Sequence, residues 1–273
     1  MTDDLAGRAA ALRALHRPGD PLILPNAWDA GSARQVAAAG FPAVATSSSA
    51  VAESLGHADG EATPPGEMFA AVARVARAVA VPVTADLERG YGLRPVELVE
   101  RLLDAGAVGL NLEDSDPRTG RLLDAGAQAD LLAEVRAAAD AAGVPVVLNA
   151  RIDVFLDAGG DPAARLPEAV SRATRYLAAG ADCVYPILLA DPAALSALVA
   201  AVPGAVNALA RPGAPAVSEL AALGVARVSY GGGLYAAARG HTQRLLDAVR
   251  AGGDPFAAAR SDPFVAARPA ASG

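Results

Sequence analysis

The feature that most constrains the fold is a regular alternation of short apolar runs with longer stretches of helical spacing. Runs of this length and composition are typical of buried strands. They lie at Leu22–Leu24, Ala43–Thr46, Pro82–Ala85, Val108–Leu112, Val144–Leu148, Cys183–Tyr185, Ala205–Leu209 and Ala226–Tyr230. Between them lie Ala-, Leu- and Arg-rich stretches such as Pro95–Ala105, Ala129–Ala142 and Leu166–Ala179. Several stretches end in Ala-Gly, and Gly is the expected residue after a helix because it adopts a left-handed conformation without penalty.

Eight strands, each followed by a helix, in about 250 residues predict a (β/α)₈ barrel of the TIM type. A doubly wound open sheet is the alternative arrangement. No shift in composition and no linker marks a second domain, so we expect one barrel domain over residues 1–273. A helix at about Asp4–His16 is expected to precede the first strand, and the Pro/Ala/Gly-rich tail at about 252–273 is expected to be loose.

Charge and cysteine content limit the classes of function. A formal net charge of −7 argues against nucleic acid or an anionic membrane as the main partner. The chain has one cysteine, Cys183, no signal-peptide pattern and no apolar run of roughly 18 residues, so the cytoplasm is the expected location. All 23 basic residues are Arg, which rules out Schiff-base chemistry through a lysine of this chain.

Acidic residues follow two neighbouring runs of the predicted barrel. Asp86 and Glu88 come after the third run, and Glu113 and Asp114 come after the fourth. Because parallel strands end at one rim, these carboxylates should converge and repel one another unless a cation lies among them. Without His or Cys companions they suit Mg²⁺ or Mn²⁺ rather than zinc. The alternative is that Asp86 and Glu88 cap a helix or pair with nearby arginines.

Other polar residues end strands at the same rim. Ser47–Ser49 could bind an anionic ligand or form an ordinary turn. Arg151 could bind a carboxylate, or could form an ion pair with Asp153 or Glu113. Asn207, within the seventh run, is a further candidate for contact with substrate.

Four motifs make the chain resemble the isocitrate lyase / phosphoenolpyruvate mutase superfamily. They are LPNAWDAGSARQVAAAGFPAVATSSSAVAESLG (24–56), TADLERGYG (84–92), LNLEDS (110–115) and NARID (149–153). The resemblance runs from about Leu22 to Tyr235, with the motifs in the family's order and spacing. It implies an α/β barrel with a helix exchanged between subunits, assembled as a homodimer or homotetramer. It also implies a Mg²⁺-dependent reaction of a small 2-oxo or 2-hydroxy carboxylate through an enolate.

The same resemblance assigns roles to individual residues. Asp86 would bind the metal directly, and Asp59, Glu88 and Glu113 would hold the waters of the ion. Ser47 and Ser48 would offer backbone N–H groups to the substrate. Arg151 would bind a carboxylate or a phosphonate.

Three departures from the family set this chain apart, the first of them from the lyases that cleave isocitrate or methylisocitrate. Those enzymes carry Lys-Lys/Arg-Cys-Gly-His in a mobile loop, whereas residues 113–131 here contain neither Cys nor His. The Lys and Asn that the mutase branch keeps in this loop are also missing. Residues 47–50 read Ser-Ser-Ser-Ala where many relatives have Ser-Gly-Ser-Gly. The metal-binding motifs are therefore retained, while the acid/base loop is replaced.

Three functions fit these observations. We favour a Mg²⁺-dependent lyase or hydrolase that cleaves a C–C or C–P bond of a small 2-oxo or 2-hydroxy carboxylate. The alternatives are an isomerase like phosphoenolpyruvate mutase and a non-catalytic protein that binds a small carboxylate. The sequence does not identify the proton-transfer group, for which His57, Tyr91, Tyr185 and Arg118 are the candidates.

Overall fold

Parallel strands form the centre of the protein. The computed structural model describes residues 2–156, 159 and 161–257. The strands are β1 (Leu22–Leu24), β2 (Asn26–Ala27), β3 (Val44–Thr46), β4 (Val83–Asp86), β5 (Gly109–Glu113), β6 (Val147–Ile152), β7 (Cys183–Pro186), β8 (Ala205–Leu209) and β9 (Arg227–Ser229). They pair in the order β1-β9-β8-β7-β6-β5-β4-β3-β2, and every pairing is parallel.

The two ends of this order are consecutive in the chain, which closes the sheet. Pro25 separates β1 from β2, and proline has no N–H to continue a ladder. On one side of it Leu22 lies in register with Arg227 of β9, and on the other Asn26 lies in register with Ala45 of β3. Taken as one interrupted strand, β1 and β2 complete a set of eight. The prediction of a (β/α)₈ barrel is confirmed, and the doubly wound sheet is not found.

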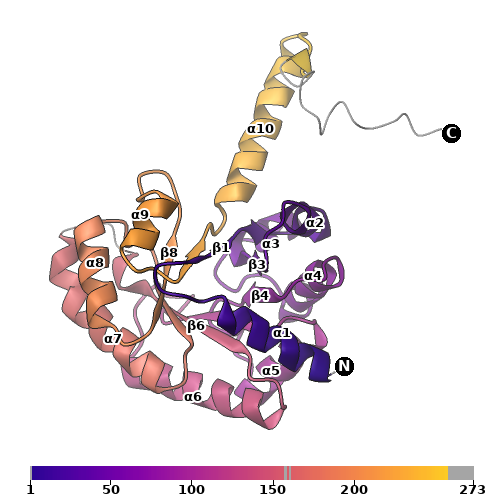
Figure 1. Ribbon diagram of the computed structural model, residues 1–273. Coiled ribbons are helices and arrows are strands. Elements are labelled where there is room, and N and C mark those ends of the chain that lie inside the picture. The colour runs from indigo at the N-terminus through magenta and orange to yellow at the C-terminus, as the bar shows by residue number, and fades with distance from the viewer. Residues whose placement is uncertain (1, 157–158, 160, 258–273) are drawn as a thin grey trace. The chain divides into compact units, whose positions relative to one another are not determined.

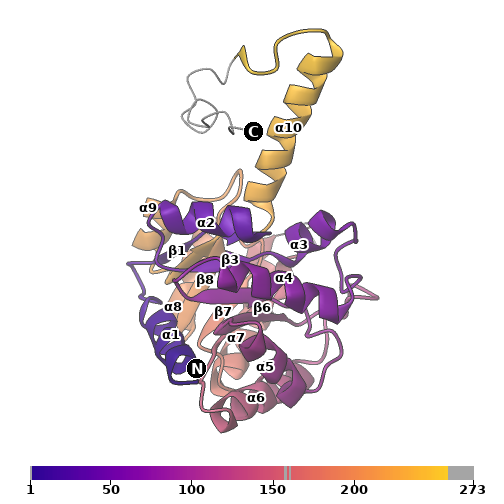
Figure 2. The same cartoon turned by 90° about the vertical axis from the view of Figure 1, so that its right-hand side faces the viewer.

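Helices surround the strands in Figures 1 and 2. Those of the barrel are α1 (Thr2–Ala14), α2 (Ala30–Ala38), α3 (Ser48–Leu55), α4 (Pro65–Arg77), α5 (Pro95–Asp104), α6 (Ala125–Ala141), α7 (Leu166–Ala178), α8 (Pro192–Ala201) and α9 (Val217–Ala222), with 3₁₀ turns η1 (Asp153–Phe155) and η2 (Pro162–Arg165). Most expected boundaries agree within a few residues. The fifth strand begins at Val147 rather than at Val144, because Pro145 cannot donate to the ladder.

Helix α1 lies across the end of the barrel at which the strands begin (Figures 1 and 2). Leu12 is fully buried there against Gly109, where an added Cβ would lie 2.9 Å from a methyl group of Leu12. Arg13 Nε donates to Asp182 Oδ1 at 2.6 Å, which ties α1 to the start of β7. Glycine at 109 therefore allows the helix to approach the sheet closely enough to fill this end.

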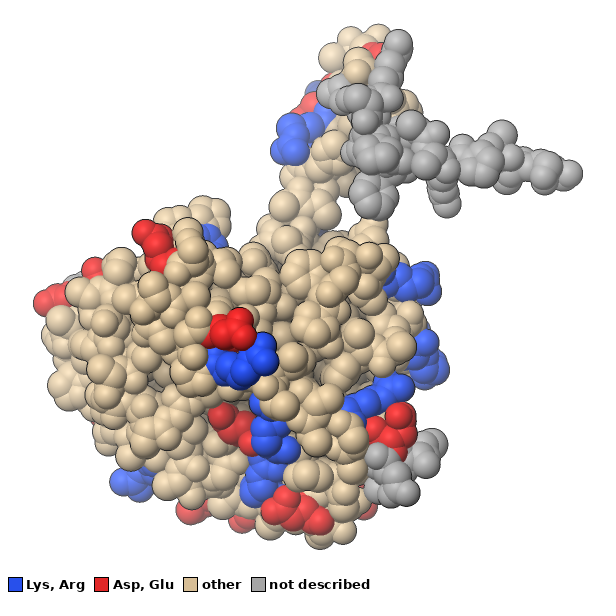
Figure 3. All heavy atoms as spheres, in the orientation of Figure 1, with Lys and Arg blue, Asp and Glu red and all other residues tan. Residues whose placement is uncertain are grey.

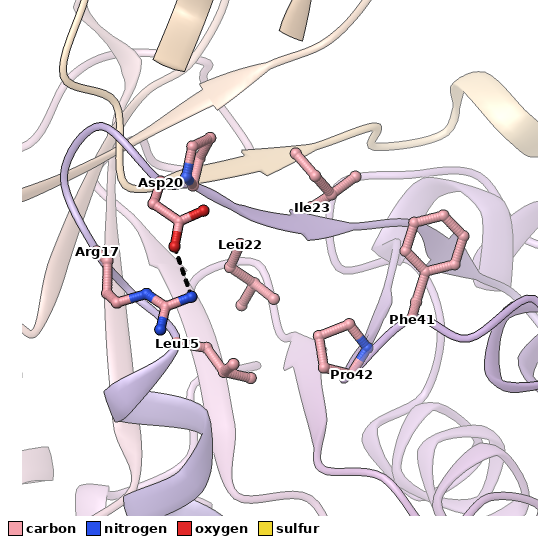
Figure 4. Close-up of a pocket in the computed structure, with 8 residues that line it drawn as sticks. Leu15, Arg17, Asp20, Leu22, Ile23, Phe41 and Pro42 are labelled. Carbon is pink, nitrogen blue, oxygen red and sulfur yellow. Dashed lines mark ion pairs between the residues drawn. The ribbon is translucent and has the colours of Figure 1, made fainter. Parts of the chain in front are cut away.

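Charged side chains on this same face stand in small groups of both signs among uncharged residues (Figure 3). A pocket of about 260 Å³ also opens on this side of the barrel, at the start of β1 (Figure 4). Its lining is mostly apolar, and its two charged residues, Arg17 and Asp20, pair at 2.6 Å. This pocket therefore lies away from the strand ends and offers no acidic cluster.

The chain divides into two compact units, residues 1–232 and residues 233–273. The first contains the barrel. The second contains α10 (Gly233–Arg250), none of whose side chains is buried. Of the predicted loose tail, residues 252–257 continue from α10 in turns, and residues 258–273 lie outside the described residues. Among the described residues, no helix combines the length and apolar content that a bilayer span requires.

The buried imidazole of His16, just after α1, should make the fold sensitive to acid. Burial, followed by the charge of Arg227, lowers the pKa of His16 to about 4, while Nδ1 contacts Leu12 O at 2.9 Å. The unfolded chain takes up this proton near pH 6.5 and the folded chain only near pH 4. Stability from this group is therefore complete above pH 6.5 and falls, by up to about 3 kcal/mol, as the pH drops to 4.

The test of this acid sensitivity compares wild type with His16→Asn, whose amide can still donate to Leu12 O but does not titrate. Urea unfolding between pH 7.5 and 4.5 should show a steeper loss of unfolding free energy for wild type than for the variant. Parallel curves would mean that His16 titrates alike in both states.

Candidate active site

Four acidic side chains gather at the carboxyl end of β4 and β5. Asp86 ends β4, Glu113 ends β5, Glu88 lies two residues beyond Asp86, and Asp59 lies between α3 and α4. The charge of Asp86 acts on each of the other three, and the backbone N–H of Glu113 donates to the carbonyl of Glu88 at 2.9 Å. The structure thus brings together the four residues that the sequence marked as metal-binding candidates.

Asp86 is held by donors on both of its carboxylate oxygens. Ser48 donates to Oδ2 through its backbone N–H at 3.0 Å and its hydroxyl at 2.9 Å. Asn111 Nδ2 donates to Oδ1 at 3.3 Å. Because Ser48 is the first residue of α3, the positive end of this helix faces Asp86. In this structure the N–H group of Ser48 therefore serves Asp86, whereas the family resemblance had assigned it to the substrate.

The other three carboxyl groups are held in a partly buried, negatively charged environment. Burial raises the pKa of Glu113 to about 9, against the opposing charge of Arg151. Burial raises the pKa of Glu88 to about 7, and that of Asp59 is raised by burial and then by the charge of Asp86. The cluster therefore holds more acidic groups than its surroundings can stabilise as anions.

Arg151 on β6 is the guanidinium beside this cluster. It makes a two-pronged contact with Asp153, Nε to Oδ1 at 2.6 Å and Nη2 to Oδ2 at 3.0 Å. It also forms an ion pair with Glu113. Both of the ion pairs considered from the sequence are present, so the orientation of Arg151 is fixed before any ligand binds.

A buried network behind the cluster supports this end of β6. Asp114 Oδ2 accepts from Tyr176 at 2.7 Å and from Arg172 at 3.0 Å, both on α7. Asp114 Oδ1 accepts from the backbone N–H of Asp153 at 2.8 Å. Asp114 therefore links helix α7 to the residue that orients Arg151.

Two loops at the mouth interlock through three residues with left-handed backbone. Glu61, Glu88 and Tyr91 have φ of 59°, 50° and 58°. Glu88 accepts from the Tyr91 hydroxyl at 2.6 Å and from the backbone N–H of Glu61 at 2.6 Å. In return Glu61 accepts from the backbone N–H groups of Tyr91 at 2.5 Å and Arg89 at 3.2 Å. Non-glycine residues in this region cost energy, so their clustering at the mouth indicates a functional constraint.

The other residues predicted to contact substrate form hydrogen bonds with neighbouring polar side chains. The hydroxyl groups of Ser47 and Ser49 contact each other at 3.1 Å, and a Cβ on Gly232 would lie 3.1 Å from Ser49 Oγ. Asn207 is fully buried on β8 and exchanges hydrogen bonds with the Ser229 hydroxyl at 3.2 Å. The recorded polar contacts of Asn207 are thus within the barrel interior.

A polar layer below the mouth was missed by the sequence analysis. Asn111 Oδ1 accepts from Asn149 Nδ2 at 2.8 Å and from Arg227 Nη2 at 3.2 Å. Arg227 is 1% exposed. The available signal was a charged residue inside the last apolar run, where alternation places positions 227 and 229 on the same face.

The four candidates for proton transfer differ in their exposure and in their contacts. His57 pairs with Glu67 at 3.3 Å near the surface, and the side chain of Arg118 is 88% exposed. Tyr91 donates to Glu88. Burial raises the pKa of Tyr185 to about 12, with Asp86 and Arg151 among the charges that act on it. Tyr185 is therefore a protonated phenol at neutral pH, within reach of the charges at the mouth.

The donor set fits a hard divalent ion that retains water. Within the described ranges, no three His, Cys, Asp or Glu side chains are arranged to hold an ion together. One direct carboxylate, Asp86, with further carboxylates placed to accept from bound water, is a normal arrangement for Mg²⁺. The raised pKa values of Glu88 and Glu113 are consistent with this fit, since a bound cation would offset the repulsion.

Comparison with known proteins gives consistent matches. The model of the family described as phosphoenolpyruvate phosphomutase matches residues 12–250. The crystal structure of a "putative phosphonomutase" from Burkholderia cenocepacia J2315 is 45% identical, with a TM-score of 0.84, over 88% of this chain and 99% of that chain. An uncharacterized Mycobacterium tuberculosis protein is 36% identical over 67% of each sequence. An oxaloacetate decarboxylase from Rhodopseudomonas palustris is 32% identical over 71% of this chain and 68% of its own length.

The Asp114 network generates a stability prediction. Tyr176→Phe removes one of the donors to a buried carboxylate and should lower the unfolding free energy by about 1–3 kcal/mol. In an Asp114→Asn background the same substitution should lower the unfolding free energy clearly less, because the charged acceptor is gone. Urea unfolding of the four proteins measures the coupling, and additive costs would contradict the network.

Proposed function

This chain belongs to the phosphoenolpyruvate phosphomutase family, and on that premise we propose that it is a Mg²⁺-dependent lyase or hydrolase of a small 2-oxo or 2-hydroxy carboxylate. The family contains lyases, hydrolases and mutases of small oxo-carboxylates. The observation that carries the proposal is the convergence of Asp59, Asp86, Glu88 and Glu113 beside Arg151. A cluster of this kind suits a cation and an anionic substrate together.

In the proposed mechanism, Asp86 would bind the metal directly, and Asp59, Glu88 and Glu113 would hold its waters. When bound, Mg²⁺ supplies the positive charge that stabilises an enolate oxygen after a C–C or C–P bond beside a carbonyl breaks. The chain has no lysine, so it has no Schiff-base route to the same stabilisation.

The residues of the chain account for substrate binding and proton transfer. Arg151 presents a guanidinium whose planar shape matches a carboxylate, and Asp153 keeps it oriented. Tyr185 retains its proton at neutral pH and is the candidate to deliver it to the enolate carbon. Residues 113–131 contribute neither Cys nor His, the acid/base groups that the lyases carry in this loop.

A second candidate, movement of a phosphonyl group within one substrate, is favoured by the 45% identity to the Burkholderia cenocepacia "putative phosphonomutase". A panel of 2-oxo and 2-hydroxy acids, with and without Mg²⁺, separates the two. Release of pyruvate or CO₂ supports bond cleavage, whereas interconversion of phosphonopyruvate and phosphoenolpyruvate in phosphorus NMR supports the isomerase. A panel without turnover, but with Mg²⁺-dependent binding of oxalate, supports a non-catalytic binding protein.

We also propose that the protein assembles as a homodimer or homotetramer through α10. Leu246 and Val249 lie one turn apart on this helix and are 56% and 57% exposed. A helix with no buried side chain gains little stability by itself, so a second copy is the partner that its apolar residues suit.

The metal site predicts a graded response to carboxylate removal. Asp86→Asn should abolish Mn²⁺ binding measured by calorimetry in the presence of oxalate, which resembles the enolate of pyruvate. Glu88→Gln and Glu113→Gln should weaken the affinity for Mn²⁺ by about 10- to 100-fold, because each acts through water. Wild-type affinity in Asp86→Asn would refute the assignment of the metal site.

The assembly predicts a response to charge on α10. Leu246→Glu combined with Val249→Glu should lower the mass measured by analytical ultracentrifugation toward that of a single chain. Arg244→Ala, which lies about 200° around the helix from Leu246, is the control and should leave the mass unchanged. A double variant with wild-type mass would exclude this surface as the contact.

A further inference from the structure

Arg227 carries a charge into the interior of the barrel. It begins β9, in register with Leu22 of β1 and Asn207 of β8, and is 1% exposed. Taking a guanidinium out of water costs several kcal/mol unless an opposite charge or a full set of hydrogen bonds compensates. The surroundings of Arg227 therefore have to contain that compensation.

Hydrogen bonds supply only part of the compensation for burying the Arg227 guanidinium. Nη2 donates to Asn111 Oδ1 at 3.2 Å, while Nε and Nη1 are buried without a hydrogen-bond partner among the described residues. No ion pair within 4.0 Å involves Arg227 in the described part of the chain. A charge that is close but not in contact can supply the rest of the compensation.

Three groups that can become anionic act electrostatically on Arg227, namely Cys183, Tyr185 and Asp86. Burial raises the pKa of the Cys183 thiol and of the Tyr185 phenol to about 12, so both are neutral at physiological pH. Asp86 is the remaining group. The carboxylate at the centre of the mouth is thus the candidate counter-charge of the buried guanidinium.

A single amide connects the two. Asn111 Oδ1 accepts from two nitrogen donors, Arg227 Nη2 and Asn149 Nδ2. An oxygen in that position fixes which way the amide faces, so the Nδ2 group must point to Asp86 Oδ1, which it contacts at 3.3 Å. Arg227, Asn111 and Asp86 therefore form a relay that runs from the interior to the mouth.

We propose that Arg227 is a positioning residue of the metal site: through Asn111 it holds the Asp86 carboxylate in the metal-free protein and competes with a divalent cation for it. The competition sets how tightly the ion is held. This inference rests on the proposed function for the metal, whereas the link from Arg227 through Asn111 to Asp86 stands on the two hydrogen bonds.

The first test uses thermal unfolding in EDTA. In the wild-type background, Asp86→Asn should lower the melting temperature, because it leaves the guanidinium without its counter-charge. In an Arg227→Met background the same substitution should lower the melting temperature clearly less, since the contacts with Ser48 are then lost but no counter-charge is removed. Asn111→Leu keeps Arg227 but breaks the relay, and should also shrink the effect of Asp86→Asn.

The second test is a Mn²⁺ titration followed by calorimetry. Arg227→Met should bind the ion about tenfold more tightly than wild type, the order expected for removing one nearby positive charge in a partly buried site. Arg227→Lys, which keeps the charge, should stay close to wild type. Arg136→Met, whose arginine pairs with Asp182 at 2.6 Å near the start of β7, is the control and should not change the affinity.

The outcomes separate this inference from the proposed function. Equal Mn²⁺ affinity in wild type and Arg227→Met, together with the same effect of Asp86→Asn in both backgrounds, would overturn the relay while leaving the metal site intact. Absence of Mn²⁺ binding in wild type would overturn the proposed function and the competition for the ion. A background-dependent effect of Asp86→Asn would still establish the pairing with Arg227.

Discussion

Repulsion among neighbouring carboxylates is the constraint on which the mouth of the barrel depends. Asp59, Asp86, Glu88 and Glu113 lie close enough for their charges to act on one another. The groups around them are donors and cations: the start of α3, the hydroxyl of Tyr91, the amide of Asn111 and the guanidinium of Arg151. Each restrains one carboxyl group, and together they keep the cluster assembled before a cation binds.

The same constraint explains why the supporting residues are so well buried. Arg151 forms an ion pair with Glu113, and its two-pronged contact with Asp153 keeps the guanidinium from turning entirely toward Glu113. Asp153 is restrained in turn by Asp114, and Asp114 by Arg172 and Tyr176 of α7. The orientation of Arg151 is thus fixed by helices and strands rather than by the loop at residues 115–122, which folds as a short hairpin held largely by its own backbone.

The sequence predicts the barrel and the acidic rim because both follow from local patterns. Alternating apolar runs locate the strands, and carboxylates such as Asp86 and Glu113 directly follow or end them. Features that depend on distant segments were not predictable. The left-handed backbone of Glu61 and Tyr91 has no signal in residue type, and the position of Arg227 beside Asn111 follows from closure of the ring. The break at Pro25 was likewise invisible without knowing that one segment pairs on both sides.

That break has a consequence for how the protein folds. The pairing of Leu22 with Arg227 joins segments from the two ends of the barrel sequence, so its loop-closure entropy is among the largest in the fold. Contacts among β3, β4, β5 and β6 are local by comparison and can form early. The carboxylates at the ends of β4 and β5 therefore belong to strands that can pair early. Arg227, the interior positive charge, is added only when β9 pairs with β1. A chain in which β1 and β9 have not yet paired would hold the carboxylates together without Arg227. Closure of the barrel therefore also adds a positive charge beneath the acidic rim.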